Sequence, residues 1–142
     1  MRISDVLRGK GSTVATVEPG LSVAGLAGEL ARHNVGAMVV LDDGQVVGIV
    51  SERDVVRQLH ERGANLLDVR VADIMTTSVV TCLPTDSVDS LAATMTERRI
   101  RHMPVLQDGS LAGIVSIGDV VKSRITELES DREQLESYIA GG

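Results

Sequence analysis

The stretch GIVSERD at residues 48–54 returns almost unchanged as GIVSIGD at residues 113–119, 65 positions later. Aligning residues 14–57 with residues 79–122 at this offset needs no gap and gives 19 identities in 44 positions. The identities include prolines, glycines and aspartates, which chance similarity between two apolar segments would not keep in register. The chain is therefore an internal duplication of a unit of about 60 residues.

Both copies predict the same order of elements: a short strand, a helix, two strands joined by a tight turn, and a second helix. A residue that can cap a helix follows a proline turn in each copy. An Asp-Gly pair between two apolar runs is a strong hairpin signal. The expected strands are 14–17, 37–41 and 45–51, and again 79–82, 102–106 and 110–116; the first helices end near Asn34 and Arg99, and the second begin near Asp54 and Asp119.

One such unit can hardly bury the face of its own sheet, whereas two units can bury their faces together. We therefore expect an α+β fold of two β-α-β-β-α repeats related by a pseudo-twofold axis, followed by a C-terminal helix. The expected division is residues 1–66 for the first repeat, 67–124 for the second and 125–142 for a helical tail. SDVL at 4–7 and VADIM at 71–75 resemble each other as short helical lead-ins.

Composition narrows the classes of function. The net charge of −6 disfavours binding to nucleic acid polymers or anionic membranes, which need a basic surface. The sequence has no apolar run of transmembrane length and no signal-peptide core, and its single cysteine, Cys82, cannot form an internal disulfide. These features favour the cytoplasm. Tyr138 is the only aromatic residue, so the core must be aliphatic.

The repeated heptad carries groups that suit a nucleotide. The glycines, Gly48 and Gly113, allow a ligand or a backbone segment to approach the strand closely. A serine hydroxyl and free amides at a helix N-terminus suit a phosphate, and a carboxylate can accept two hydrogen bonds from vicinal ribose hydroxyls. Ser-x-x-Asp is also a capping box that many helices use, and the two roles are compatible.

The paired units resemble a tandem of cystathionine-β-synthase (CBS) domains, a Bateman module. The resemblance covers about residues 3–124 and is carried by ADIM (72–75), TVEP (16–19), TCLP (81–84), HMPVLQDG (102–109) and the two GIVSxxDVV segments. It implies a module that regulates rather than catalyses and that binds an adenine nucleotide or a similar ligand. It also implies that Asp54 and Asp119 hold ribose and that Ser51 and Ser116 hold phosphate.

A second positive signal is RRIRHMP at residues 98–104. Arg101 and His102 border a strand that would face the cleft, where a guanidinium binds phosphate in a bidentate manner and an imidazole donates a hydrogen bond or, at about pH 6.5, becomes charged. Arg98 and Arg99 fit equally well as cations at a helix C-terminus. Met103 and Pro104 are candidate walls for adenine.

The two copies differ at these positions. The first has Gly36-Ala37 where the second has Arg101-His102, whereas Arg53 of the first is matched by Gly118. We therefore expect two chemically unequal clefts, of which one binds a nucleotide better, with Arg53 as a further candidate for neutralising phosphate.

Catalytic and metal sites are not indicated. The histidines and Cys82 do not have the spacing of zinc ligands, and no nucleophile elbow, Walker loop or GxGxxG motif occurs. We expect no catalytic residue, no metal and no obligatory cofactor.

The C-terminal residues 119–140 predict a long helix with an apolar stripe that Arg132 interrupts. The stripe is either a short seam for a second copy or the contact face of a single helix across its own domain. The main hypothesis is a homodimeric regulatory sensor for an adenosine-containing ligand: AMP, ADP, ATP or S-adenosylmethionine. The alternative is a ligand-free dimeric scaffold that acts on a protein target.

Overall fold

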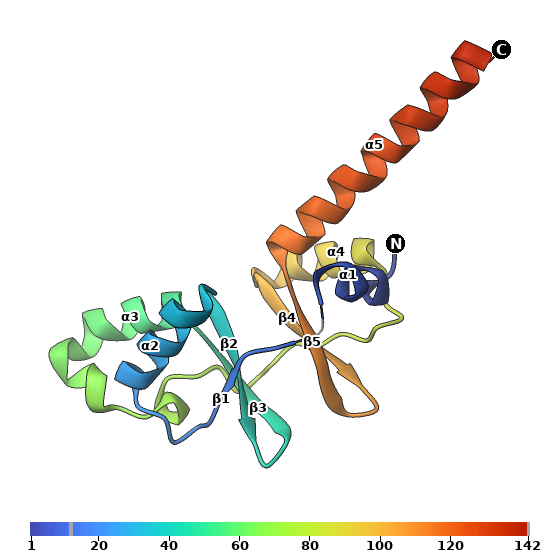
Figure 1. Cartoon of the computed structure of the whole chain (residues 1–142). Helices are drawn as coiled ribbons and strands as arrows, with labels where there is room; N and C mark the ends of the chain where they lie inside the picture. The colour runs from blue at the N-terminus through green and yellow to red at the C-terminus, as the bar shows by residue number, and fades with distance from the viewer. Residues whose placement is uncertain (12, 142) are drawn as a thin grey trace.

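The computed structural model describes residues 1–11 and 13–141 and consists of two similar lobes with a long C-terminal helix (Figure 1). Ser12 and Gly142, which fall within the expected first repeat and tail, lie outside the described residues. The elements are α1 (Ile3–Lys10), β1 (Thr16–Val17), α2 (Val23–His33), β2 (Ala37–Asp42), β3 (Gln45–Ser51), α3 (Glu52–Arg62), the 3₁₀ turns η1 (Gly63–Asp68) and η2 (Val71–Asp73), α4 (Val88–Arg98), β4 (His102–Gln107), β5 (Ser110–Ser116) and α5 (Ile117–Gly141).

Each lobe is built on a hairpin whose turn the sequence predicts. The turn residues Asp43-Gly44 have φ angles of 51° and 78°, and Asp108-Gly109 have 54° and 81°. Positive φ at both central residues defines the type I′ turn, whose twist matches that of the paired strands. The hairpins β2–β3 and β4–β5 follow with the same register and the same bulge. The predicted α+β repeat is confirmed in both copies.

The first short strand differs between the copies. In the first lobe β1 pairs in parallel with β2 and completes a three-stranded sheet. In the second lobe the predicted strand at 79–82 reduces to a single bridge between Cys82 and Val105. The Cys82 amide donates to the Pro104 carbonyl at 3.0 Å, and the Leu106 amide donates to the Cys82 carbonyl at 2.9 Å. The prediction of a strand there was therefore too long.

The lead-in segments pack on the lobe of the other copy. Ile3 and Leu7 of α1 lie in the aliphatic core of the second lobe, whereas Val71 and Ile74 lie in the core of the first. Figure 1 shows α1, in dark blue, within the second lobe. Matching hydrogen bonds hold both segments: the Ile3 amide donates to the Asp86 carbonyl at 2.9 Å, as the Val71 amide does to the Leu21 carbonyl at 2.8 Å. The packing units thus cross the boundary between residues 66 and 67.

The lead-ins also explain the glycines of the repeated heptad. A Cβ atom at Gly48 would lie 2.5 Å from the Met75 sulfur and 3.1 Å from the Thr76 carbonyl oxygen. A Cβ atom at Gly113 would lie 2.6 Å from a terminal methyl of Leu7. The close approach that the sequence predicts at these glycines is therefore made by the lead-in segments and not by the cavity described below.

The predicted C-terminal helix is α5, which extends 25 residues away from the second lobe (Figure 1). Only Val120 and Ser123 of this helix are buried. None of the helices in the described part of the chain is long and apolar enough to span a bilayer.

Candidate functional site

The site begins where β3 passes into α3. The Ser51 hydroxyl oxygen accepts from the Asp54 amide at 3.2 Å, while Asp54 Oδ2 accepts from the Ser51 amide at 2.9 Å and from its hydroxyl at 3.0 Å. This is the predicted capping box, and it fixes the carboxylate against the first turn of α3. Oδ1 makes no hydrogen bond to any described residue and has only Arg57, at 3.9 Å, as an ionic neighbour. One carboxylate oxygen is therefore structural and the other is free to accept.

The β3–α3 junction forms one wall of a cavity of about 630 Å³ between the lobes. Residues between α4 and β4 of the second copy also line the cavity, as do four residues of the segment 76–80. The lining residues are Gly36, Ala37, Ile49, Val50, Ser51, Glu52, Arg53, Asp54, Val56, Arg57, Thr76, Ser78, Val79, Val80, Arg99, Ile100, Arg101 and His102. A cavity of this size suits a small organic ligand.

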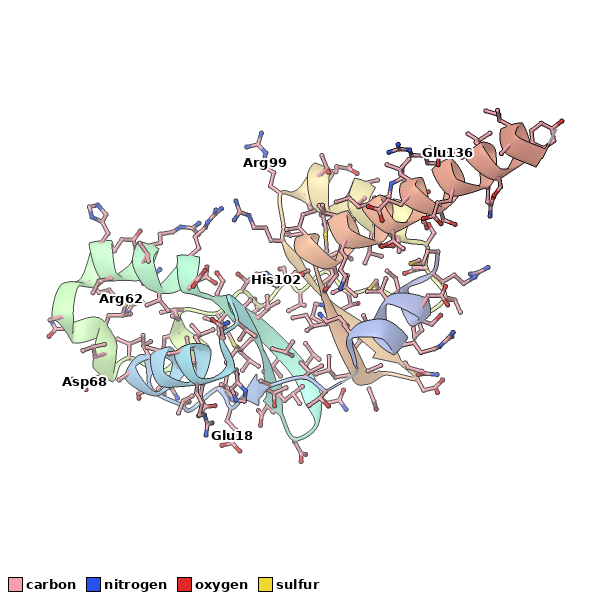
Figure 2. The ribbon with its side chains drawn as sticks, turned by 45° about the horizontal axis from the view of Figure 1, so that its top comes forward. Glu18, Arg62, Asp68, Arg99, His102 and Glu136 are labelled. Atoms are coloured by element: carbon pink, nitrogen blue, oxygen red, sulfur yellow. The ribbon has the colours of Figure 1, made fainter. Side chains whose placement is uncertain are left out.

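Positive charge is concentrated at this cavity. Four of the twelve arginines of an otherwise acidic chain line it, against two carboxylates, Glu52 and Asp54. Within residues 1–11 and 13–141, Arg53, Arg99 and Arg101 form no ion pair. Figure 2 shows Arg99 at the rim, at the end of α4, and His102 deep between the lobes. Unpaired guanidiniums around an apolar hollow make a site for an anionic group.

His102 supplies a neutral polar group in the wall. Burial lowers its pKa, and the positive charges of Lys10 and Arg101 lower it further, against the opposing effects of Asp119 and Glu52. Because the pKa lies below that of a free histidine, the imidazole is uncharged at neutral pH and can donate or accept one hydrogen bond.

The second heptad has the same cap but a different neighbour. Ser116 and Asp119 repeat the capping box with distances of 3.2, 2.9 and 3.1 Å. Here Lys10 Nζ lies 2.6 Å from Asp119 Oδ2 and 2.9 Å from the Ile114 carbonyl oxygen. Burial acts to raise the pKa of Asp119, but the bonds from Lys10 and Ser116 outweigh it, and the pKa is lowered. Neither Ser116 nor Asp119 lines the cavity.

The structure separates the predicted site residues into groups. Ser51, Arg53, Asp54, Arg101 and His102 line one cavity, although they come from both copies. Met103 is 2 % exposed and belongs to the core of the second lobe. Pro104 is buried, and its carbonyl oxygen bonds to Cys82. Neither residue is among those that line the cavity, so the adenine walls proposed at these two positions do not contribute to it.

Sequence reasoning missed several groups at the two heptads. Arg57, one turn after Arg53 on α3, could have been found from helical spacing. Thr76, Ser78 and Lys10 lie between or before the aligned repeats, so no internal comparison highlights them. No group of histidine, cysteine or acidic residues that could hold a metal occurs among the residues the structure describes.

Comparison with known proteins places this site in a family. The model of the CBS domain matches residues 3–61 and 71–125. The CBS domain-containing protein CBSX3, mitochondrial, of Arabidopsis thaliana is 36 % identical over 99 % of this chain and 72 % of its own length. The crystal structure of the CBS-domain containing protein ATU1752 from Agrobacterium tumefaciens is 46 % identical, with a TM-score of 0.85 over 87 % of this chain and 99 % of that one.

A third similar structure contains ligands. It is the CBS domain pair of protein MJ0100 in complex with 5′-methylthioadenosine and S-adenosyl-L-methionine. That chain is 26 % identical to this one, with a TM-score of 0.76 over 86 % of this chain and 98 % of that one. Both of its ligands contain adenosine.

Proposed function

Since the chain belongs to the CBS domain family and contains the domain twice, we propose that it is a regulatory module that binds an adenine nucleotide, of the AMP, ADP or ATP type, in the cavity between its repeats. The observation that carries the proposal is the set of unpaired arginines around an apolar cavity that also contains a free carboxylate oxygen. A nucleotide offers the complementary groups: phosphate, an apolar base and vicinal hydroxyls. No catalytic step is proposed.

Asp54 is the proposed ribose ligand. Its Oδ1 atom is available for the sugar hydroxyls, while Oδ2 is held by the amide and hydroxyl of Ser51. Ser51 was expected to hold phosphate, but its hydroxyl already donates to Asp54 and accepts from the Asp54 amide. Its proposed first role is therefore to orient Asp54, and the phosphate falls to Arg53, Arg101 and the neutral His102.

The base has an apolar wall available. Four aliphatic residues from both copies line the cavity and could sandwich a purine ring: Ile49, Val79, Val80 and Ile100. The MJ0100 domain pair, which binds two adenosine compounds, supports adenosine as the shared part of the ligand. The arginines favour a phosphate over the sulfonium of S-adenosylmethionine, because a cation next to unpaired guanidiniums is repelled.

A thermal-shift panel of adenosine, AMP, ADP, ATP, S-adenosylmethionine and GMP tests the proposal. AMP should raise the melting temperature more than adenosine does, because only AMP has a phosphate for the arginines to bind. A ligand at 100 times its Kd stabilises the fold by about 2.7 kcal/mol. Asp54→Asn keeps the cap but weakens a charged acceptor worth roughly 1.5–3 kcal/mol. It should lower AMP affinity roughly ten- to a hundredfold.

The matched control is Asp42→Asn, at an exposed position in the same repeat. This variant should keep the full AMP-dependent shift. Absence of a shift with every nucleotide in the unmodified protein would reject the sensor and leave the dimeric scaffold as the remaining hypothesis.

In this proposal, ligand binding changes the geometry of a homodimer that α5 helps to form. Its exposed apolar residues follow the 4–3 spacing of a coiled-coil seam, and Arg132 occupies the one polar position. The apolar residues of the seam are Val121, Ile125, Leu128, Leu135 and Ile139. An antiparallel pair centred near residue 130 places Arg132 against the partner's Leu128 and Lys122 beside the partner's Glu136. A parallel pair would instead bring Arg132 against the partner's Arg132, a repulsion that the antiparallel pair of two copies avoids.

A further inference from the structure

We propose that Lys10 is an intramolecular occupant of the site at the second heptad (the second cleft), where it keeps a nucleotide from Asp119 by holding that carboxylate. The inference rests on the proposed function of the first cavity and specifies its regulation: the first cavity binds ligand, and the second heptad does so only when Lys10 leaves Asp119. The N-terminal helix that carries Lys10 thereby sets the number of ligands that the module binds.

The two heptads present their carboxylates in the same way. The distances in the two capping boxes agree within 0.1 Å for each of the three hydrogen bonds. Asp119 is thus as well oriented for a sugar as Asp54 is. The difference between the clefts must come from what approaches the carboxylate.

A different chain segment approaches each carboxylate. Leu7 and Met75 are counterparts, since each packs against the heptad glycine of the lobe it covers. Three residues further along the chain, these lead-ins place Lys10 and Ser78 at equivalent positions. Ser78 is short and lines the first cavity, whereas the side chain of Lys10 reaches Asp119 and the Ile114 carbonyl.

The contact is strong enough to compete with a ligand. The side chains of Lys10 and Asp119 are 34 % and 20 % exposed, so the pair is only partly screened by water. An ammonium–carboxylate hydrogen bond is stronger than one from a neutral hydroxyl. Lys10 binds Oδ2, the capping oxygen of Asp119, so a ribose that approached Oδ1 would meet a carboxylate whose charge an ammonium already neutralises.

An opened second cleft would also recognise a different ligand. By the repeat alignment, the positions of Arg53, Arg99 and Arg101 are taken there by Gly118, Asn34 and Gly36. The cleft therefore lacks the guanidiniums of the first cavity. Once free of Lys10, it should bind adenosine about as well as AMP, whereas the first cavity should prefer AMP.

Titration calorimetry on the full chain tests this. The unmodified protein should bind one equivalent of AMP. Asp54→Asn should weaken this binding, whereas Asp119→Asn should leave it unchanged. Lys10→Met should gain a second equivalent of adenosine, and Asp119→Asn in that background should remove it. Lys122→Met, which changes the only other lysine, should bind as the unmodified protein does.

The opposite results overturn the inference. If Lys10→Met adds no second site, or weakens binding because Lys10 itself contacts the ligand, the occupant model is wrong while the proposed function stands. If the unmodified protein binds no nucleotide, the proposed function fails. The contact between Lys10 and Asp119 is then tested by an experiment that needs no ligand.

Amine labelling followed by mass spectrometry tests whether Asp119 holds Lys10. Lys10 and Lys122 are the only lysines, so each modification is assigned unambiguously. Lys10 should be acylated more slowly than Lys122, and Asp119→Asn should abolish its protection. Equal labelling of Lys10 in the unmodified protein and in Asp119→Asn would show that Asp119 does not hold it.

Discussion

At the residue scale, the same sequence motif acquires two chemistries. Asp54 and Asp119 have identical caps, yet one keeps a free oxygen in a cationic cavity and the other is neutralised by Lys10. His102, which lines the first cavity, is affected by the second heptad, since Lys10 and Asp119 act on its pKa in opposite directions. The protonation of this histidine therefore depends on charges from both repeats.

His102 should titrate below the value of about 6.5 for a free histidine. Because its pKa is lowered on folding, the unfolded chain binds the proton more readily, so this group favours folding above about pH 6.5 and its contribution is lost as the pH falls below that value. AMP should raise the pKa, since a phosphate favours the imidazolium. The measurement is an NMR titration of the His102 ring proton with and without AMP, with His102→Gln for assignment; a midpoint above 6.5 in the free protein would contradict this.

At the scale of elements, the heptad strand is shaped by what packs on it. Both β3 and β5 carry a bulge just before the heptad glycine, and a lead-in segment covers that glycine. The Gly-Ile-Val-Ser repeat is therefore a packing motif at its start and a capping motif at its end. In the first repeat, Ile49, Val50 and Ser51 line the ligand cavity together with the residues that follow the serine.

Gly48→Ala should lower the free energy of unfolding by roughly 1–3 kcal/mol, since overpacking forces the backbone to shift. Gly113→Ala should cost less, because its new methyl meets only the flexible side chain of Leu7 and no backbone atom such as the Thr76 carbonyl. Gly28→Ala in α2 is the control: nothing lies within 4 Å, and the change should stabilise by about 0.5–1 kcal/mol. Urea denaturation of the three variants gives the order, and equal stability of Gly48→Ala and Gly28→Ala would refute it.

At the scale of the molecule, the exchange of lead-ins ties the lobes into one unit. The second core contains Ile3, which no part of the second repeat's own sequence supplies. The first core is completed in the same way by Val71. Neither core is therefore complete without a segment from beyond its own aligned repeat.

Ile3→Ala should destabilise the protein by roughly 2–5 kcal/mol, because it removes methyl groups from a fully buried site. Hydrogen exchange should then accelerate first in β4 and β5, more than 80 residues away in the chain, and later in β2 and β3. Val71→Ala is the symmetric variant and should show the reverse order. Uniform acceleration across both hairpins would argue that the two cores do not open separately.

The α5 seam should be visible as a change of mass. The protein should elute at about twice its 15.0 kDa chain mass in light-scattering chromatography, and Leu135→Glu should shift it toward the monomer by placing a charge in the seam. Gln134→Glu introduces the same charge one residue away, on the opposite face, and should remain dimeric. A Leu135→Glu dimer as stable as that of Gln134→Glu would exclude α5 as the contact.

The sequence by itself determined the duplication, the Asp-Gly hairpins, the Ser-x-x-Asp caps and the long C-terminal helix, because each depends on residues that are near neighbours in the chain. Tertiary structure alone decided that the lead-ins cross over, that the second short strand shrinks to one bridge, that Met103 and Pro104 turn inward, and that Lys10 meets Asp119. It also placed Arg101 and His102 opposite Asp54. These contacts join residues tens of positions apart, and their geometry follows from how two lobes pack, which no local pattern encodes.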